Sequence, residues 1–222
     1  MTPPVVDYRQ LRPSNLTEPR FRHLLYLLYW PLYGLLFMYV ERFSPIEYYY
    51  PIYSPLDDYI PFCELFVIPY MFWFAYLVIQ HAYGLFYDIA GFKWLMRYII
   101  ITYSAAIIIY LLFPNCQELR PVEFPRDNFL TRFMAGFYQF DTNTNVCPSI
   151  HVMGSLAVLS AAWRAPAFKT TPWRIAYTVT AVLISVSTVF LKQHSVLDVL
   201  AALPICLVAE LYCRYMGRKE AA

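Results

Sequence analysis

The sequence predicts an all-α membrane protein with six transmembrane helices, forming one integral membrane domain over residues 1–222. Of the 222 residues, 59% are hydrophobic and 19% are aromatic, whereas only 14% are charged. A soluble domain carries about a quarter charged residues, so much of the apolar surface is expected to face lipid. The apolar residues also gather in six stretches that polar segments separate.

The six stretches differ in length. A membrane-spanning helix needs about 20 residues, with a working range of about 17–25. The fourth stretch is shorter than this because Ala165-Pro166 ends it, so its outer end is expected to lie below the ends of the others. The stretches lie near residues 24–40, 62–86, 94–113, 149–163, 173–191 and 196–216.

The positions of the lysines and arginines predict the orientation. Short loops rich in these residues stay in the cytoplasm. We therefore expect both termini inside, including a tail over residues 1–23, and loops near 41–61, 114–148 and 192–195 outside. Twelve of the 17 basic residues lie on the expected inner side: Arg9, Arg12, Arg20, Arg22, Lys93, Arg97, Arg164, Lys169, Arg174, Arg214, Arg218 and Lys219.

Three polar segments fall on the expected outer side, at the ends of the third to sixth helices. Ionisable residues at membrane depth are costly and commonly functional. These segments span residues 113–121, 147–151 and 187–198. The sequence therefore predicts an active site at this end of the bundle.

Two histidines and an aspartate in these segments indicate proton and nucleophile chemistry. His194 and Asp198 are four residues apart, which places them on one face of a helix. A carboxylate there can hold one imidazole nitrogen and leave the other as a nucleophile. His151 comes from another helix and can protonate a departing alkoxide.

Three further residues indicate that the group transferred is a phosphate. Ser149 stands at a helix start, where a hydroxyl and backbone amides bind anions. Arg120 and Lys192 add fixed positive charge, and Arg120 has the geometry for two parallel hydrogen bonds. Together the six residues predict phosphoryl transfer through a phosphohistidine.

Two alternatives concern metals and disulfides. His194 and Asp198 also have metal-ligand spacing and with His151 would provide three zinc ligands, but such a site would not need the surrounding cations. We therefore expect no metal and no other cofactor. Cys116 and Cys147 share the long outer loop, where they are either bonded to each other or two unrelated thiols.

The three segments resemble the motifs of the type 2 phosphatidic acid phosphatase superfamily. The matching residues are Arg120-Pro121, Pro148-Ser149-x-His151 and Ser187-x6-His194-x3-Asp198. The chain is also similar to the branch that contains inositol phosphorylceramide synthases and related bacterial proteins, and the resemblance covers roughly residues 55–205. The residues of that second similarity are Asp57-Asp58 to Phe62, Pro69 to Trp73, Phe113-Pro114 and Lys192-Gln193-His194.

The resemblance implies six spanning helices and an outward-facing site. In it His194 would be the nucleophile, Asp198 its orienting partner and His151 the general acid, while Arg120 and Ser149 match phosphate-binding positions. The chain departs from the pattern at three positions. Phe113 stands where a lysine is usual, Thr188 where an arginine follows the serine, and Lys192 where a glycine precedes the histidine.

The predicted function is a membrane phosphatase or phosphotransferase acting on a lipid or isoprenoid phosphate. The expected partners are that substrate, the membrane and an alcohol or lipid acceptor. No nucleic acid is expected, because no basic run, zinc pattern or nucleotide-binding glycine signature occurs. The expected location is a bacterial plasma membrane, or a membrane with the site facing the lumen in a eukaryote. The alternative is a silent lipid-binding or lipid-translocating protein of the same fold. The sequence leaves open the oligomeric state and whether Lys192 replaces a missing cation.

Overall fold

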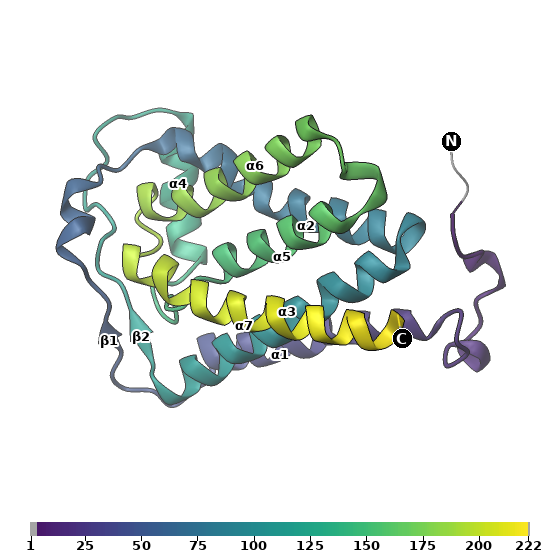
Figure 1. Ribbon diagram of the computed structural model, residues 1–222. Helices are drawn as coiled ribbons and strands as arrows, with labels where there is room; N and C mark the ends of the chain where they lie inside the picture. The colour runs from purple at the N-terminus through teal and green to yellow at the C-terminus, as the bar shows by residue number, and fades with distance from the viewer. Residues whose placement is uncertain (1–3, 222) are drawn as a thin grey trace.

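The computed structural model describes residues 4–221 as a bundle of helices lying along one common direction (Figure 1). The two longer loops that we expect outside, near residues 41–61 and 114–148, lie at one end of the bundle with the two short strands, and we call them the first outer loop and the long outer loop. The N-terminal segment and the end of the last helix lie at the other end. The helices are α1 (Tyr29–Arg42), α2 (Val67–Tyr87), α3 (Ile89–Leu112), α4 (Phe129–Phe140), α5 (Ile150–Arg164), α6 (Thr171–Phe190) and α7 (Val196–Ala221). The strands are β1 (Tyr50–Pro51) and β2 (Asn115–Cys116), which pair in parallel.

Five helical segments are long and apolar enough to cross a membrane, and the chain is an integral membrane protein on this basis. At 1.5 Å per residue, the 15 residues of α5 extend about 22 Å, less than the roughly 30 Å of a hydrocarbon core. The short fourth helix was expected, and six spans remain a prediction. The five segments are Arg22–Arg42, Glu64–Tyr87, Ile89–Leu112, Thr171–Phe190 and Val196–Lys219.

Helix α5 lies at the centre of the bundle and contacts α2, α3, α6 and α7. Many of its buried residues are small, including Ala157, Ala161 and Ala162, and small side chains allow helices to approach closely in a membrane. Gly154 shows how close this approach is. A Cβ atom at this position would lie 2.5 Å from the Tyr103 hydroxyl and 3.0 Å from the Trp73 ring nitrogen. The central helix therefore holds its N-terminal turn in a fixed place.

The long outer loop contains a helix that we did not predict from the sequence. Asn128 caps the start of α4, and its Oδ1 accepts hydrogen bonds from the amides of Leu130 and Thr131. At 12 residues the helix is too short for a span. It buries Met134 and turns Phe137 onto Tyr70 of α2. The strand pair is a second, smaller departure from the all-α prediction.

Candidate active site

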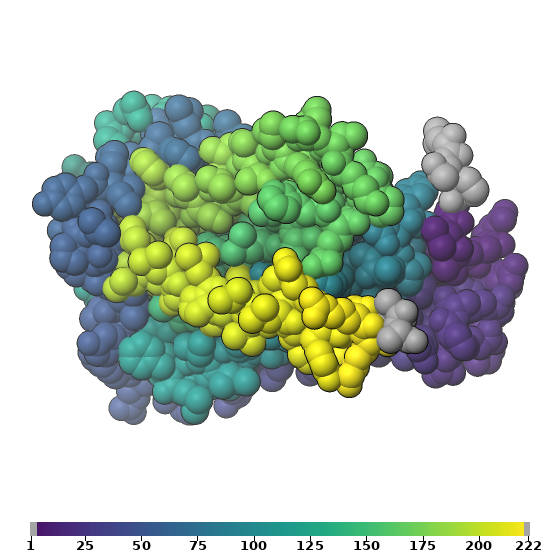
Figure 2. All heavy atoms as spheres, in the orientation of Figure 1, coloured from purple at the N-terminus to yellow at the C-terminus, as the bar shows by residue number. Residues whose placement is uncertain are grey.

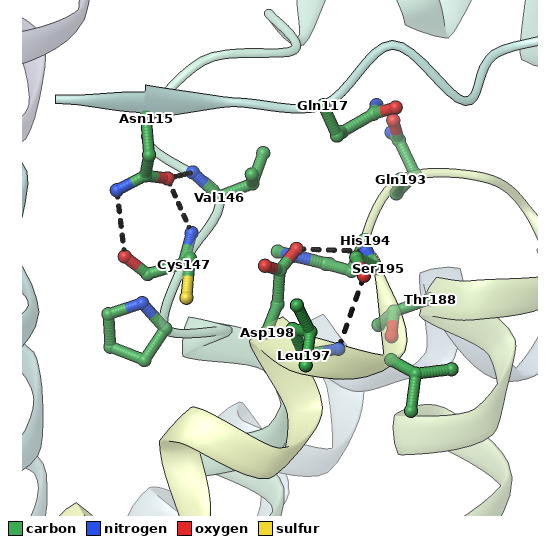
Figure 3. A network of polar contacts seen from close by, with 12 residues as sticks. Asn115, Gln117, Val146, Cys147, Thr188, Gln193, His194, Ser195, Leu197 and Asp198 are labelled. Atoms are coloured by element: carbon green, nitrogen blue, oxygen red, sulfur yellow. Dashed lines mark hydrogen bonds and ion pairs between the residues drawn. The ribbon is translucent and has the colours of Figure 1, made fainter. Parts of the chain in front are cut away.

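His194 and Asp198 lie in direct contact at the start of α7 (Figure 3). The His194 Nδ1 is 3.0 Å from the Asp198 Oδ2, and Asp198 is completely buried. We predicted this contact because we expected both residues on one face of a helix. The contact is present, but that reason is wrong. His194 comes before α7, which begins only at Val196.

The contact arises from the way α7 is capped. The Ser195 Oγ accepts a hydrogen bond from the Leu197 amide, and the Asp198 Oδ2 accepts one from the Ser195 amide. This arrangement resembles a capping box, with a serine before the helix and an acid three residues later, but the serine hydroxyl binds the second amide of the helix and not the third. The acid of this arrangement also holds the imidazole, so the Nε2 of His194 is the nitrogen left for chemistry.

His151 faces this pair from the first turn of α5. The centroid of its ring lies 5.7 Å from that of His194, at an interplanar angle of 67°. On its other sides the ring contacts Tyr70 and Trp73 of α2, with centroid distances of 4.5 and 4.4 Å. Within residues 4–221 no group hydrogen-bonds to the buried Nδ1 of His151. Aromatic packing thus orients this imidazole and leaves its nitrogen available for proton transfer.

Ser149 precedes α5 and connects it to α7. Its amide donates to the Asp198 carbonyl oxygen over 3.1 Å. Its hydroxyl is buried and finds no hydrogen-bond partner in the described part of the chain. The first amides of a helix have no acceptors within the helix and attract anions. The structure therefore brings Ser149, His151, His194 and Asp198 together.

Arg120 lies beside this group, and most of its donors are engaged by the protein. Its Nη1 donates to the carbonyl oxygens of Tyr138 and Asp141, and its Nη2 donates to Thr142 and to the Gln193 side chain. Of the guanidinium donors, the Nε–H has no partner among the described residues. Burial lowers the pKa of Arg120, yet an arginine stays charged in proteins. The positive charge of Arg120 thus lies next to the site, while its Nη1 and Nη2 groups bind carbonyl oxygens of the long outer loop and the side chain of Gln193.

Asp141 is a partly buried acid near the site that the sequence did not lead us to expect. Its Oδ2 accepts a hydrogen bond from the Gln193 Nε2 over 3.0 Å. Burial raises the pKa of Asp141, and the nearby charges of Arg120 and His194 oppose this rise. The carboxylate therefore counters part of the positive charge of Arg120.

Lys192 takes a conformation that explains the glycine of the motif. Its φ of 53° lies in the left-handed region, which glycine enters freely and other residues rarely enter. Its Nζ donates to the Asp57 carbonyl oxygen over 2.7 Å, and burial lowers the pKa of this amine. The side chain lines a cavity of about 590 Å³, together with Tyr53, Asp58 and Glu118. The carboxylates of Asp57 and Asp58 lie close enough to interact with its charge.

Thr188 stands where the motif has an arginine, and its groups serve the backbone. Its hydroxyl donates to the Ser185 carbonyl, and its own carbonyl accepts the amides of Gln193 and His194. The hydroxyl of Ser187 likewise donates within α6, to Ile184. These hydroxyls hold the end of α6, so neither hydrogen is directed to a substrate.

Asn115 of β2 holds the segment that leads into α5 (Figure 3). Its Oδ1 accepts the amides of Val146 and Cys147, and its Nδ2 donates to the Cys147 carbonyl. The sequence placed this residue in an active-site segment but gave it no role. Tyr70, Trp73 and Gln193 were also missed as contacts of the site. The signal for Gln193 was its position between Lys192 and His194.

Metals and disulfides were the open alternatives. In the stretch 4–221, no three or more His, Cys, Asp and Glu side chains form a group that could hold a metal ion. The chain has five cysteines, all within this stretch and all free. Cys116 and Cys147 are therefore separate thiols here.

Comparison with known proteins identifies the family. The model of the PAP2 superfamily matches residues 94–221, which include α5, α6, α7 and every predicted site residue. No curated protein and no solved structure shows a significant match to the chain. Members of this superfamily are generally phosphatases or phosphotransferases, and the superfamily suggests phosphatase-type activity on lipid phosphates. With more than half of its length matched, the chain belongs to the PAP2 superfamily.

Proposed function

We propose that the protein cleaves a phosphate ester of a lipid or isoprenoid through a phosphohistidine on His194. The observation that carries the proposal is the contact between the His194 Nδ1 and the buried Asp198 carboxylate. This contact favours the tautomer with a proton on Nδ1 and a lone pair on Nε2. The carboxylate also stabilises the positive ring that forms during attack.

The first half-reaction forms a bond between the His194 Nε2 and phosphorus and breaks the bond from phosphorus to the ester oxygen. The departing alkoxide takes a proton from His151, whose ring lies across from His194. In the second half-reaction His151 takes a proton from water or an alcohol, which attacks phosphorus and frees His194. Water gives a phosphatase and an alcohol gives a phosphotransferase.

Several groups would meet the negative charge of the phosphate. The Ser149 hydroxyl has no partner in the described stretch, so it can donate to a phosphate oxygen. The amides at the start of α5 add a favourable dipole. Arg120 contributes its charge and its Nε–H, and Lys192 adds a more distant charge. Preorganised donors of this kind stabilise charge that develops in a transition state.

The dimensions of α5 support a lipid substrate. The helix is shorter than the hydrocarbon core, and its N-terminal turn carries His151. If its other end reaches the opposite interface, His151 lies near the depth of lipid headgroups. A phosphate on a lipid would then reach the histidines without leaving the membrane.

The proposed orientation puts the site on the non-cytoplasmic side, because basic residues concentrate at the other end. Cysteine labelling of intact cells tests it, on a background without the five native cysteines. An impermeant reagent should label Asp127→Cys and spare Lys169→Cys. The opposite pattern would reverse the orientation.

The assay for function uses purified protein with phosphatidic acid, undecaprenyl diphosphate and a mixture of ceramide and phosphatidylinositol, with and without EDTA. Released phosphate and new lipids are both quantified. We expect turnover of at least one substrate and no loss of activity in EDTA.

The engaged donors of Arg120 and the threonine at position 188 favour a second candidate, a silent lipid-binding protein. That candidate predicts lipid binding with no turnover of any of these substrates.

A further inference from the structure

We propose that Asp57, in the first outer loop, is a positioning residue that fixes the segment carrying His194. The inference rests on the proposed role of His194 as the nucleophile. Asp57 lies outside the part of the chain that the family model matches. It reaches the site from 137 positions before His194 and is completely buried.

The Asp57 carboxylate binds the start of α7. Its Oδ1 accepts the Val196 amide over 2.8 Å, and its Oδ2 accepts the Ser195 hydroxyl over 2.6 Å. The Oδ2 also accepts the amide of Ser54, which ties the carboxylate to its own loop. A negative charge at a helix N-terminus is favourable. The carboxylate thus joins the first outer loop to the first turn of α7.

Ser195 connects Asp57 to the catalytic pair. Its hydroxyl donates to Asp57, while its amide donates to the same Asp198 oxygen that holds His194. One residue therefore lies between two buried carboxylates. A shift of Ser195 would move the Asp198 contact and the imidazole with it.

The backbone of Asp57 holds the other end of the same segment. Its carbonyl accepts a hydrogen bond from the Lys192 Nζ, and Lys192 keeps a left-handed φ that is strained in a residue other than glycine. Asp57 contacts the segment before His194 through Lys192 and after it through Ser195. In Figure 2 the first outer loop (blue) lies against the junction of α6 and α7 (yellow-green).

Capping alone does not account for Asp57. The helix α7 already has a cap in Ser195 and the acid of the same capping arrangement in Asp198. Asp57 adds a fixed direction for the Ser195 hydroxyl and an anchor for Lys192. Both contacts restrain the four residues that carry His194, which supports a role in positioning.

The first experiment measures single-turnover formation of phosphoenzyme from an aryl phosphate. Asp57→Asn keeps the size of the side chain and removes an acceptor oxygen and the charge. A small misplacement of a reacting group costs up to about 10²-fold. We expect phosphoenzyme formation to slow by about 10–10²-fold, with KM changed less than about threefold. Asp58→Asn is the matched control and should react at the wild-type rate, because exposed Asp58 bonds to Tyr53.

The time course of phosphoenzyme formation separates positioning from a loss of folded protein. A misplaced His194 lowers the rate constant of the single-turnover burst and leaves its amplitude unchanged. A smaller folded fraction lowers the amplitude and leaves the rate constant unchanged. We expect Asp57→Asn to lower the rate constant.

Ser195→Ala is the second variant, because it removes the link and keeps Asp57. It should slow phosphoenzyme formation in the same direction, and the double variant should be little slower than Asp57→Asn. Equal rates for Asp57→Asn, Asp58→Asn and the wild type would overturn the inference. So would additive effects of Asp57→Asn and Ser195→Ala.

Hydrogen exchange tests the contact without using activity. In Asp57→Asn the amides of Val196, Leu197 and Asp198 should lose protection, while those of α5 keep it. Unchanged protection at α7 would overturn the inference even for an inactive protein. A wild type without phosphoenzyme would instead contradict the proposed function.

Discussion

The two halves of the site differ in what their polar groups bind. In the histidine half, Asp198 holds His194, aromatic rings hold His151, and the Ser149 hydroxyl has no partner within the described residues. In the cation half, four hydrogen bonds commit Arg120 to loop carbonyls and to Gln193. The first half is arranged for chemistry, and the second also maintains the structure of the outer loop.

This difference indicates that the residues that orient the histidines and the cations that bind the phosphate can be substituted independently of each other. The contacts that orient His194 arise at the start of α7, and those that orient His151 are aromatic contacts with Tyr70 and Trp73 of α2. The charges depend on single long side chains, and two cations of the motif are replaced by Phe113 and Thr188. Changes in the histidine half should therefore act on kcat. Changes in the cation half should act on KM and on stability.

The largest effect should come from His194. His194→Ala should lower kcat by about 10⁴-fold or more, because loss of a nucleophile removes the covalent route. Asp198→Asn should cost about 10²–10⁴-fold, since an amide favours neither the tautomer nor the charged ring. The measurement is turnover of the substrate found in the lipid assay. Equal activity of His194→Ala and the wild type would show that His194 is not the nucleophile.

His151→Ala should show an effect that depends on the leaving group. A lipid alkoxide needs a proton to depart, whereas an activated phenolate needs little help. General acid catalysis is worth about 10²–10⁴-fold, so the lipid phosphate should lose that much more rate than an aryl phosphate. Rates for both substrates in each variant provide the test. Equal losses on the two substrates would contradict the role of general acid.

Arg120→Lys sharpens the comparison in the cation half. Lysine keeps the charge but cannot donate hydrogen bonds to all four acceptors that the planar guanidinium of Arg120 binds. We expect the melting temperature to fall and KM to rise by about tenfold. The change in kcat should be smaller than the change in KM. Arg126→Lys is the control, because Arg126 is an exposed residue paired with Glu64. A fall in kcat alone, without loss of stability, would show that Arg120 acts mainly in the transition state.

The smallest effect should come from Lys192→Gly. Glycine removes the strain of the left-handed backbone, and this gain offsets the loss of the hydrogen bond to Asp57. Each of the two effects is worth about 1 kcal/mol. Activity should stay within about fivefold of the wild type. Lys192→Met keeps the strained backbone without the hydrogen bond and should be less stable than Lys192→Gly. A large rise in KM for both variants would instead show that Lys192 meets the phosphate directly.

The sequence predicted the parts of this molecule that depend on local patterns. Apolar length identified the helices to within a few residues at most ends, and the short α5 followed from Ala165-Pro166. The contact of His194 with Asp198 was predicted, although its cause is the cap of α7 and not a shared helix face. The serine and the acid of that capping arrangement were visible in the sequence and would have given the right reason.

The contacts that the sequence could not predict join distant segments. The carbonyls that bind Arg120 come from residues 138–142, and their position depends on how α4 packs on α2. The direction of Lys192 depends on the first outer loop, which folds over the start of α7. Spacing within one segment carries no information on either arrangement. For the same reason Asp57 and Asp141 were not recognised as neighbours of the site.

The central claim is that His194 carries the phosphoryl group. The most direct measurement traps the enzyme during turnover of an aryl phosphate and locates acid-labile, base-stable phosphate by peptide mass spectrometry. We expect phosphate on the peptide with His194, none in His194→Ala, and accumulation in His151→Ala, where the second half-reaction lacks its base. Phosphate that persists in His194→Ala and disappears in His151→Ala would reverse the two roles and contradict the account.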